Sequence, residues 1–141
     1  GLGAPLGCLD KARYGISWGA IGVAMDCYEA SKRYSLERKQ FNKPIGSFQL
    51  IQKKLAEMLT EITKAQLLRW KLVKLMNEWK ATTASNIVRE ARQIHGGMGI
   101  TNEYPMMRHM MNLESVLTYE GTHEIHLLIL GNEITGIPSF E

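Results

Sequence analysis

The 141-residue sequence has little of several features that would point to a specialised class of protein. Its two cysteines, Cys8 and Cys27, have a spacing that suits neither a metal site nor a disulfide framework, which favours a reducing compartment. No apolar run approaches the roughly 20 residues that span a membrane, and no signal peptide is recognisable. The net charge of +3 is spread along the chain, which argues against nucleic-acid binding. We therefore expect no metal, no membrane and no nucleic acid.

No stretch alternates apolar and polar residues with a period of two, so strands are not predicted. The composition, 45% hydrophobic and 22% charged, is typical of a single globular domain over residues 1–141. The first seven residues have the composition of a linker or of the end of a preceding domain. The predicted fold class is all-α, an up-and-down helical bundle of two long helices and three shorter ones.

Helical periodicity and breaking residues predict where these helices lie. We expect helices at about 9–38, 48–79 and 85–94, one that starts at Asn102, and one after Glu120. A polar stretch at 81–85 predicts a break, and Gly96 and Gly97 end the third helix. Three glycines in the first helix would permit close approach of another helix: Gly15, Gly19 and Gly22.

The most informative stretch is 117–126, in which one carboxylate, that of Glu120, stands between an aromatic ring and a glycine. Thr122 follows as an expected N-cap of the last helix. A carboxylate just before a helix feels the positive end of the helix dipole, which favours its ionised form and suits a general base. Acidic residues near N-caps are also common without any catalytic role, so spacing alone leaves both interpretations open.

Two further segments could bind an anion. Positive charge gathers near the break after the first helix, where Arg38 stands close to Phe41 and could hold a phosphate. The glycine-rich turn at 95–100 could cradle an anion or lie against a flat ring. Solvated charge at a helix end and a simple glycine cap are the structural alternatives.

Taken together, several segments resemble the C-terminal domain of the acyl-CoA dehydrogenase flavoprotein family. They occur in family order and are 37–41 (ERKQF), 49–58 (QLIQKKLAEM), 93–99 (QIHGGMG), 103–105 (EYP) and 119–122 (YEGT). The glutaryl-CoA dehydrogenase branch is the most similar. The segments that suggest this branch are 111–114 (MNLE), 118–123 (TYEGTH) and 134–137 (ITGI).

The resemblance implies that FAD is the cofactor, bound partly across subunits. Arg38 and Gln49 match residues that bind the FAD phosphates and adenosine half, and Phe140 matches a flavin contact of the glutaryl branch. Thr122 matches another flavin contact. The turn that packs on the adenine end of FAD is matched by Gln93, Ile94, His95, Gly96 and Gly97.

The resemblance also implies a catalytic base and a substrate surface. Glu120 matches the base, and Gly121 matches a residue that lies against the bound acyl thioester. In a minority of relatives the base lies on the first helix, at the position of Ala12, which cannot accept a proton here. The segment that matches the acyl-CoA contact consists of Leu6, Gly7, Cys8, Leu9, Asp10, Lys11, Ala12 and Arg13.

In a protein of this kind, Glu120 would remove the α-proton of an acyl-CoA while a hydride leaves the β-carbon for FAD. In the glutaryl branch, loss of CO2 then gives crotonyl-CoA, and the electrons pass to electron-transfer flavoprotein. The family is tetrameric and occurs in the bacterial cytoplasm or the mitochondrial matrix. An isolated helical module that serves only oligomer assembly, and another short-chain branch of the family, remain alternative interpretations.

The sequence departs from the family pattern in two respects. The N-terminal helical domain and the middle β-domain are absent, so we expect this chain alone to be inactive. The region 78–93 is also shorter than the family pattern by roughly five helical turns, so the third helix would cover only half of the second. Uncovered apolar residues in 68–79 would then favour a dimer.

Overall fold

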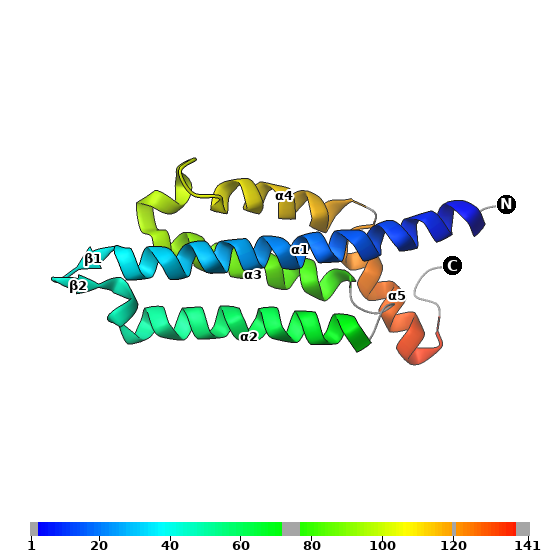
Figure 1. Ribbon diagram of the computed structural model, residues 1–141. Helices are drawn as coiled ribbons and strands as arrows, with labels where there is room; N and C mark the ends of the chain where they lie inside the picture. Colours follow the sequence, from blue (N-terminus) through cyan, green and yellow to red (C-terminus); the bar gives the residue numbers. More distant parts are fainter. Residues whose placement is uncertain (1–2, 72–76, 120, 138–141) are drawn as a thin grey trace.

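The computed structural model describes residues 3–71, 77–119 and 121–137. Its helices are α1 (Gly3–Glu37), α2 (Gln49–Lys71), α3 (Asn77–His95), α4 (Met106–Thr118) and α5 (His123–Thr135). The first four run up and down along one axis, and α5 lies across the end at which α1 begins (Figure 1). The predicted all-α up-and-down bundle is confirmed.

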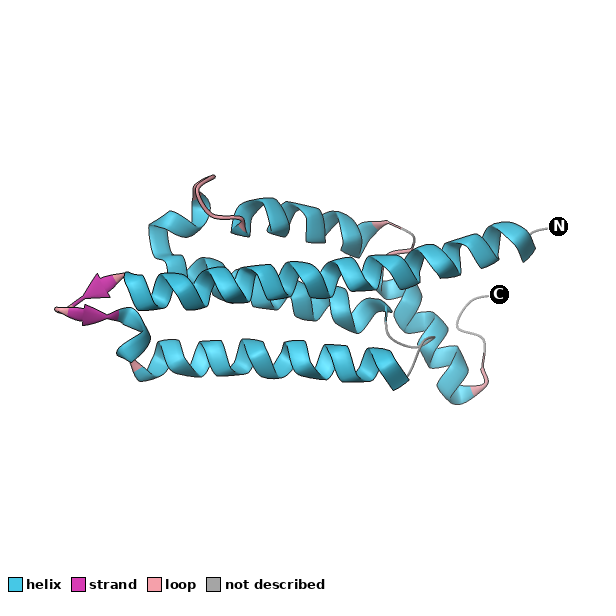
Figure 2. Cartoon of the chain, viewed as in Figure 1, coloured by secondary structure: helices cyan, strands magenta, loops and turns pink. Residues whose placement is uncertain are grey.

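Short irregular pieces join the helices. A hairpin of two-residue strands, β1 (Lys39–Gln40) and β2 (Lys43–Pro44), projects beyond the bundle after α1 (Figure 2). Two 3-10 turns follow, η1 (Ile45–Ser47) before α2 and η2 (Gly96–Ile100) after α3. The period-two signal did not predict the strands because two residues are too few to alternate. No helix in the described part of the chain is long and apolar enough to cross a lipid bilayer.

Several predicted boundaries are wrong. The first helix starts before residue 9 and includes residues 3–7, expected to be a linker or the end of a preceding domain. Pro5 is tolerated because it lies in a first turn whose N–H groups need no helical partner. The fourth helix starts at Met106, with Pro105 as its N-cap, so 102–105 form a turn instead. Gly96 and Gly97 do end α3, and Thr122 is the N-cap of α5, although its side chain makes no capping hydrogen bond.

The expected break at 81–85 lies inside α3. Ala84 and Ser85 are buried, so packing overrides the weak helix propensity of this polar stretch. The second helix ends at Lys71 in the described residues instead of continuing to residue 79. In the described part of the chain, α2 has 23 residues and α3 has 19, so the two helices are similar in length. The apolar residues expected to be uncovered lie almost entirely outside the described side chains, so that expectation stays a prediction.

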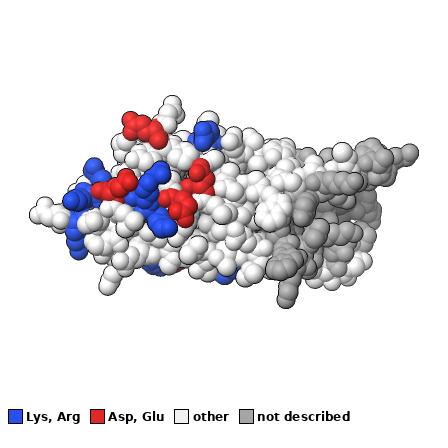
Figure 3. All heavy atoms as spheres, in the orientation of Figure 1, with Lys and Arg blue, Asp and Glu red and all other residues white. Residues whose placement is uncertain are grey.

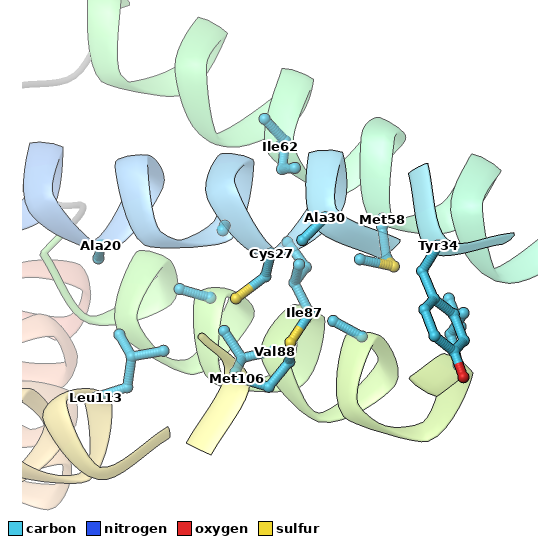
Figure 4. Close-up of a cluster of buried hydrophobic side chains, with 14 residues drawn as sticks. Ala20, Cys27, Ala30, Tyr34, Met58, Ile62, Ile87, Val88, Met106 and Leu113 are labelled. Carbon is cyan, nitrogen blue, oxygen red and sulfur yellow. The ribbon is translucent and has the colours of Figure 1, made fainter. Parts of the chain in front are cut away.

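The core lies between α1 and α3, with α2 and α4 packed on either side. Figure 4 shows side chains from these helices converging on this space, among them Cys27, Met58, Val88 and Met106. Small side chains on α1 permit the close approach of α3: Ala20, Ala24, Cys27 and Ala30. Gly15, Gly19 and Gly22 do not have this role, because a Cβ atom at any of them would meet nothing within 4 Å.

Candidate functional site

A hollow of about 450 Å3 lies beside the turn that follows α3, at the hairpin end of the bundle. Its lining comes from the end of α1, the hairpin and the glycine turn: Tyr34, Arg38, Gln40, Ile45, Ile94, His95, Gly96, Gly97 and Met98. Five of the predicted cofactor residues are therefore brought together here, although 50 or more residues separate Arg38 from the others in sequence. We call this cavity the turn hollow.

The geometry of the glycine turn follows from its sequence. Gly96 has a φ of +57°, a left-handed conformation that favours glycine, and it turns the chain away from the α3 axis. Gly97 and Gly96 are both exposed, and a Cβ at either would meet no neighbour within 4 Å. Gly99 is different, because a Cβ there would lie 2.4 Å from the carbonyl oxygen of Arg92. The turn is thus pressed against α3 at Gly99 and open at Gly96 and Gly97.

Aromatic rings form the inner wall of the turn hollow. The imidazole of His95 is stacked on Tyr34, with ring centroids 4.3 Å apart, and it contacts Tyr104 at 4.6 Å. The ring nitrogen Nδ1 of His95 lies 2.8 Å from the carbonyl oxygen of Ala91, to which it donates. Burial lowers the pKa of His95 below its ordinary value of 6.5, and the hydrogen bond to Ala91 partly opposes this.

The hairpin brings Arg38 to the rim of the hollow. The backbone N–H of Ile45 donates to the Arg38 carbonyl oxygen at 2.8 Å, which closes the base of the hairpin. At the tip, Phe41 and Asn42 have φ values of +52° and +64°, the pattern of a type I′ hairpin turn. Asparagine tolerates this conformation, whereas a bulky aromatic residue rarely adopts it. The Phe41 side chain is 85% exposed, so it projects into solvent from a backbone in this strained conformation.

A second hollow, of about 750 Å3, lies on the α2 side of the hairpin. It shares Gln40, Ile45 and Ile94 with the turn hollow, and Gln49, the first residue of α2, also lines it. Its wall includes Phe48, which contacts Phe41 edge-on at 6.0 Å and has the Lys43 ammonium 4.4 Å above its ring. Six of the nine predicted cofactor residues thus lie around two adjoining hollows.

Positive charge surrounds this end of the molecule. In Figure 3, Lys and Arg side chains gather towards the hairpin, interleaved with acidic ones. Arg33, Arg38, Lys39 and Lys43 are all exposed. A guanidinium, an exposed glycine turn and a set of flat rings are groups that bind a phosphorylated ligand with an aromatic ring. The donor set of the two hollows therefore suits a nucleotide.

Other predicted site residues lie elsewhere. Gln93 is exposed on α3 but lines neither hollow. Gly121, with a φ of +101°, and Thr122 lie between α4 and α5, at the opposite end of the bundle (Figure 1). Since the 13 residues of α4 alone extend about 20 Å, these two residues and the turn hollow do not form one continuous site within a chain.

The predicted base, Glu120, and the predicted flavin contact Phe140 lie outside the described residues. The predicted substrate segment, 6–13, is helical and belongs to the first turns of α1, where Cys8 and Ala12 are exposed. This part of α1 extends past α3, at the same end as the α4–α5 connection (Figure 1). The roles assigned to these residues stay predictions.

Sequence reasoning missed the two tyrosines that hold His95. Tyr34 lies one helical turn before Arg38, and Tyr104 belongs to the EYP segment. The spacing of Tyr34 four residues before an already suspected arginine could have indicated it. Gln40 and Ile45 were also missed, because their position depends on a two-residue hairpin that periodicity does not reveal.

The fold and this corner define a helical bundle with a nucleotide-compatible hollow at one end, and comparison with known proteins agrees. The family described as "Acyl-CoA dehydrogenase, C-terminal domain" matches residues 1–135. The chain belongs to the acyl-CoA dehydrogenase family.

Individual relatives refine this placement. A glutaryl-CoA dehydrogenase structure from Mycobacterium smegmatis is 47% identical, with a TM-score of 0.92 over 99% of this chain and 40% of that one. A second such structure, in complex with FADH2, is 46% identical, with a TM-score of 0.90 over 100% of this chain and 40% of that one. A short-chain specific acyl-CoA dehydrogenase of Megasphaera elsdenii is 35% identical over 89% of this chain and 36% of its own length. The chain thus spans well under half the length of these relatives.

Proposed function

We propose that this chain is the FAD-contacting, base-bearing domain of an acyl-CoA dehydrogenase of the glutaryl-CoA type. The observation that carries the proposal is the turn hollow, in which Arg38, His95, Gly96 and Gly97 meet although the sequence separates them. The donor set fits the adenosine and phosphate half of FAD, and the similar structure that holds FADH2 supports the choice of cofactor.

In the proposed site, each group has a separate task. The Arg38 guanidinium pairs with a phosphate, and the exposed glycine turn faces the adenosine half. FAD, when bound, supplies the acceptor for the hydride of the β-carbon. Glu120 accepts the α-proton, and the left-handed Gly121 allows the thioester to approach the backbone beside it. The segment 6–13 contacts the acyl-CoA.

The separation of the two groups of residues supports a site shared between copies. The turn hollow and Gly121 lie at opposite ends of the bundle, so FAD held at one end of a chain would meet the base of another copy. We therefore propose that the complete protein is a homotetramer and that this chain by itself forms a dimer. Electron-transfer flavoprotein would receive the electrons, in the bacterial cytoplasm or the mitochondrial matrix.

The substrate is proposed as glutaryl-CoA, with oxidation followed by decarboxylation to crotonyl-CoA. The greater identity to the glutaryl-CoA dehydrogenase structures, 47% against 35% for the short-chain relative, supports this over another short-chain branch. A non-catalytic oligomerisation module is the second candidate, favoured by the exposed apolar side chains of α2: Leu50, Leu59 and Leu67.

A flavin titration separates these candidates. We expect addition of FAD to this chain to shift the flavin absorbance, and Arg38→Ala to weaken binding by at least about tenfold, since a charge-assisted hydrogen bond contributes about 1.5–3 kcal/mol. Arg33→Ala is the matched control, because Arg33 is an exposed arginine near the end of α1, five residues before Arg38, but lines neither hollow. We expect it to weaken binding less than about twofold.

The same chain mixed with glutaryl-CoA, FAD and a dye acceptor is expected to show no turnover, because it holds only part of each proposed site. Turnover would refute the proposed inactivity of the isolated chain. Absence of any flavin shift, together with self-association in sedimentation, would favour the oligomerisation module. Equal losses in the two arginine variants would mean that general charge, and not the turn hollow, attracts FAD.

A further inference from the structure

The glycine turn is held by a cluster of three rings, which we call the aromatic cluster: the buried Tyr34 and His95 and the half-buried Tyr104. Tyr34 and Tyr104 meet edge-on, with centroids 5.4 Å apart, and His95 contacts both. These rings come from the last turns of α1, the last residue of α3 and the segment before α4. His95 is only 2% exposed, so the imidazole is the centre of a junction of three separate elements.

The hydrogen bonds of His95 define its protonation state. A carbonyl oxygen only accepts, so Nδ1 carries the hydrogen that it donates to Ala91 at 2.8 Å. The other ring nitrogen, Nε2, is buried and has no hydrogen-bond partner among the described residues. In the neutral ring, this leaves one acceptor without a partner. Protonation of Nε2 would place a buried N–H donor without a partner and a buried positive charge on the ring. The free energy of burying both is considerably higher than that of burying one acceptor without a partner.

The surroundings of the imidazole do not compensate that charge. The rings that face it are those of Tyr34 and Tyr104. The charged residues within four positions of the three rings in the sequence are Lys32, Arg33, Glu37, Arg38, Arg92, Glu103 and Arg108. The tyrosine faces would favour a cation, but burial prevails, and the pKa of His95 lies below its ordinary value. The neutral ring is therefore the form that the cluster is built around.

The position of the ring is coupled to the position of the turn. His95 is the N-cap of η2, directly before Gly96, and the Tyr34 hydroxyl donates to the His95 carbonyl oxygen at 3.4 Å. The next residues, Gly96 and Gly97, line the turn hollow. Movement of the imidazole out of the aromatic cluster would thus move the backbone that forms the hollow.

We propose that His95 is a positioning residue, which holds the glycine turn in its observed place only as the uncharged imidazole, so that acidification releases the turn. The consequence for FAD rests on the proposed function, whereas the movement of the turn does not. Since the unfolded chain binds a proton at the ordinary histidine pKa and the folded chain only at a lower one, stability also falls as the pH falls between the two.

The first test needs no ligand. In the intact chain labelled with 15N-glycine, we expect the amide resonances of Gly96, Gly97 and Gly99 to move with pH at the same midpoint as the ring protons of His95. His95→Phe keeps an aromatic ring but cannot take a proton, so its glycine resonances should not move between pH 7.5 and the acid side of that midpoint. Wild-type glycine resonances that ignore the titration of His95 would overturn the proposal, even if the variant failed to fold.

A matched control is available in His109. Its Nδ1 is likewise buried and without a partner among the described residues, but its Nε2 pairs with Asp26 at 2.8 Å, and neither residue lines the turn hollow. His109→Phe should leave the pH dependence of the three glycine resonances as it is in the wild type. If His109→Phe abolished that dependence and His95→Phe did not, the switch would belong to the junction of α1 with α4, and the proposal would be wrong.

The second test measures FAD affinity against pH. If only the chain with neutral His95 binds, affinity falls about tenfold for each pH unit below the pKa of His95, and this loss is absent in His95→Phe. An equal acid loss in both proteins would overturn the proposal. If the wild type binds no FAD at any pH, the proposed function fails, and the glycine resonances alone decide the role of His95.

Discussion

The two ends of the bundle differ in how completely the described chain covers its own apolar groups. At the hairpin end, Ile94 and Met106 are buried, and the aromatic cluster closes the junction of three elements. At the other end, the large apolar side chains described on α5 are between 39% and 75% exposed: Ile125, Leu127, Leu128, Ile129 and Ile134. The hairpin end thus has a closed cluster, although Phe41, Leu50 and Ile100 around it are exposed, whereas every large apolar side chain described on α5 is exposed.

This difference is informative because the apolar residues of α5 are not confined to one face of the helix. A helix of that composition is typical of a position surrounded by other protein, whereas a surface helix has an apolar stripe and a polar face. The described chain leaves α5 without such surroundings, and Gly121 and Thr122, which match the family's reactive end, lie directly before it. The hairpin end thus depends on contacts within the chain, and the α5 end is suited to contacts from outside it.

Two methionines of α4 give the largest expected contrast between covered and uncovered positions. Met106 is fully buried, so Met106→Ala should lower the free energy of unfolding by about 2–5 kcal/mol through lost burial and a cavity. Met111 lies on the same helix but is 64% exposed. Met111→Ala should therefore change the free energy of unfolding by less than about 0.5 kcal/mol. Urea unfolding of both variants measures the difference. Similar losses would mean that α4 is not anchored through Met106.

Two glycines of the turn after α3 give a smaller contrast, within the hairpin end itself. Gly99→Ala should destabilise the chain by about 1–3 kcal/mol, because the added Cβ would lie 2.4 Å from the Arg92 carbonyl oxygen and the turn must shift. Gly97→Ala should stay within about 0.5 kcal/mol of the wild type, since a Cβ there meets no neighbour. Thermal unfolding compares them. Equal losses of stability in the two variants would mean that an added Cβ strains the whole turn and not Gly99 alone.

The fold class could be predicted from the sequence because helical periodicity is a local signal that extends over many residues. The boundaries depended on packing instead. The stretch at 81–85 has the composition of a break, yet Ala84 and Ser85 are buried in the middle of α3. Similarly, the glycines of α1 were expected to permit close packing, whereas alanines and Cys27 do so. Which face of a helix is covered is decided by its neighbours, which the pattern of one helix does not contain.

The candidate site was predictable to the extent that it follows motifs. The turn at 95–100 and Arg38 were suspected from their residue types, and the structure brings them together around the turn hollow. The role of His95 was not predictable in its present form. It was expected to contact the cofactor, and it does line the turn hollow, but its ring also packs between Tyr34 and Tyr104, which no motif indicated. A motif states which residues are adjacent in sequence, and the rings that enclose His95 come from other elements.

The two cysteines give the smallest expected effect on stability and the sharpest test of where the chain is closed. Cys27 is fully buried, and burial, with a further contribution from Asp26, raises the pKa of its thiol to about 12. Because the thiolate is the reactive form, Cys27 should not react with a maleimide at pH 8 in the folded chain. Cys8 is exposed in the first turns of α1, so mass spectrometry should find one label per chain.

Cys8→Ser is the control for this labelling, and it should accept no label until urea unfolds the core and exposes Cys27. The free energy of unfolding should be nearly the same in Cys8→Ser and the wild type, since an exposed side chain at this end contributes little packing. Labelling of Cys27 in the folded chain at a rate close to that of Cys8 would mean that the α1–α3 core opens readily. The two ends of the bundle would then differ only in how far their apolar side chains are covered. A core that opens on the labelling timescale is not held closed by the contacts within the chain.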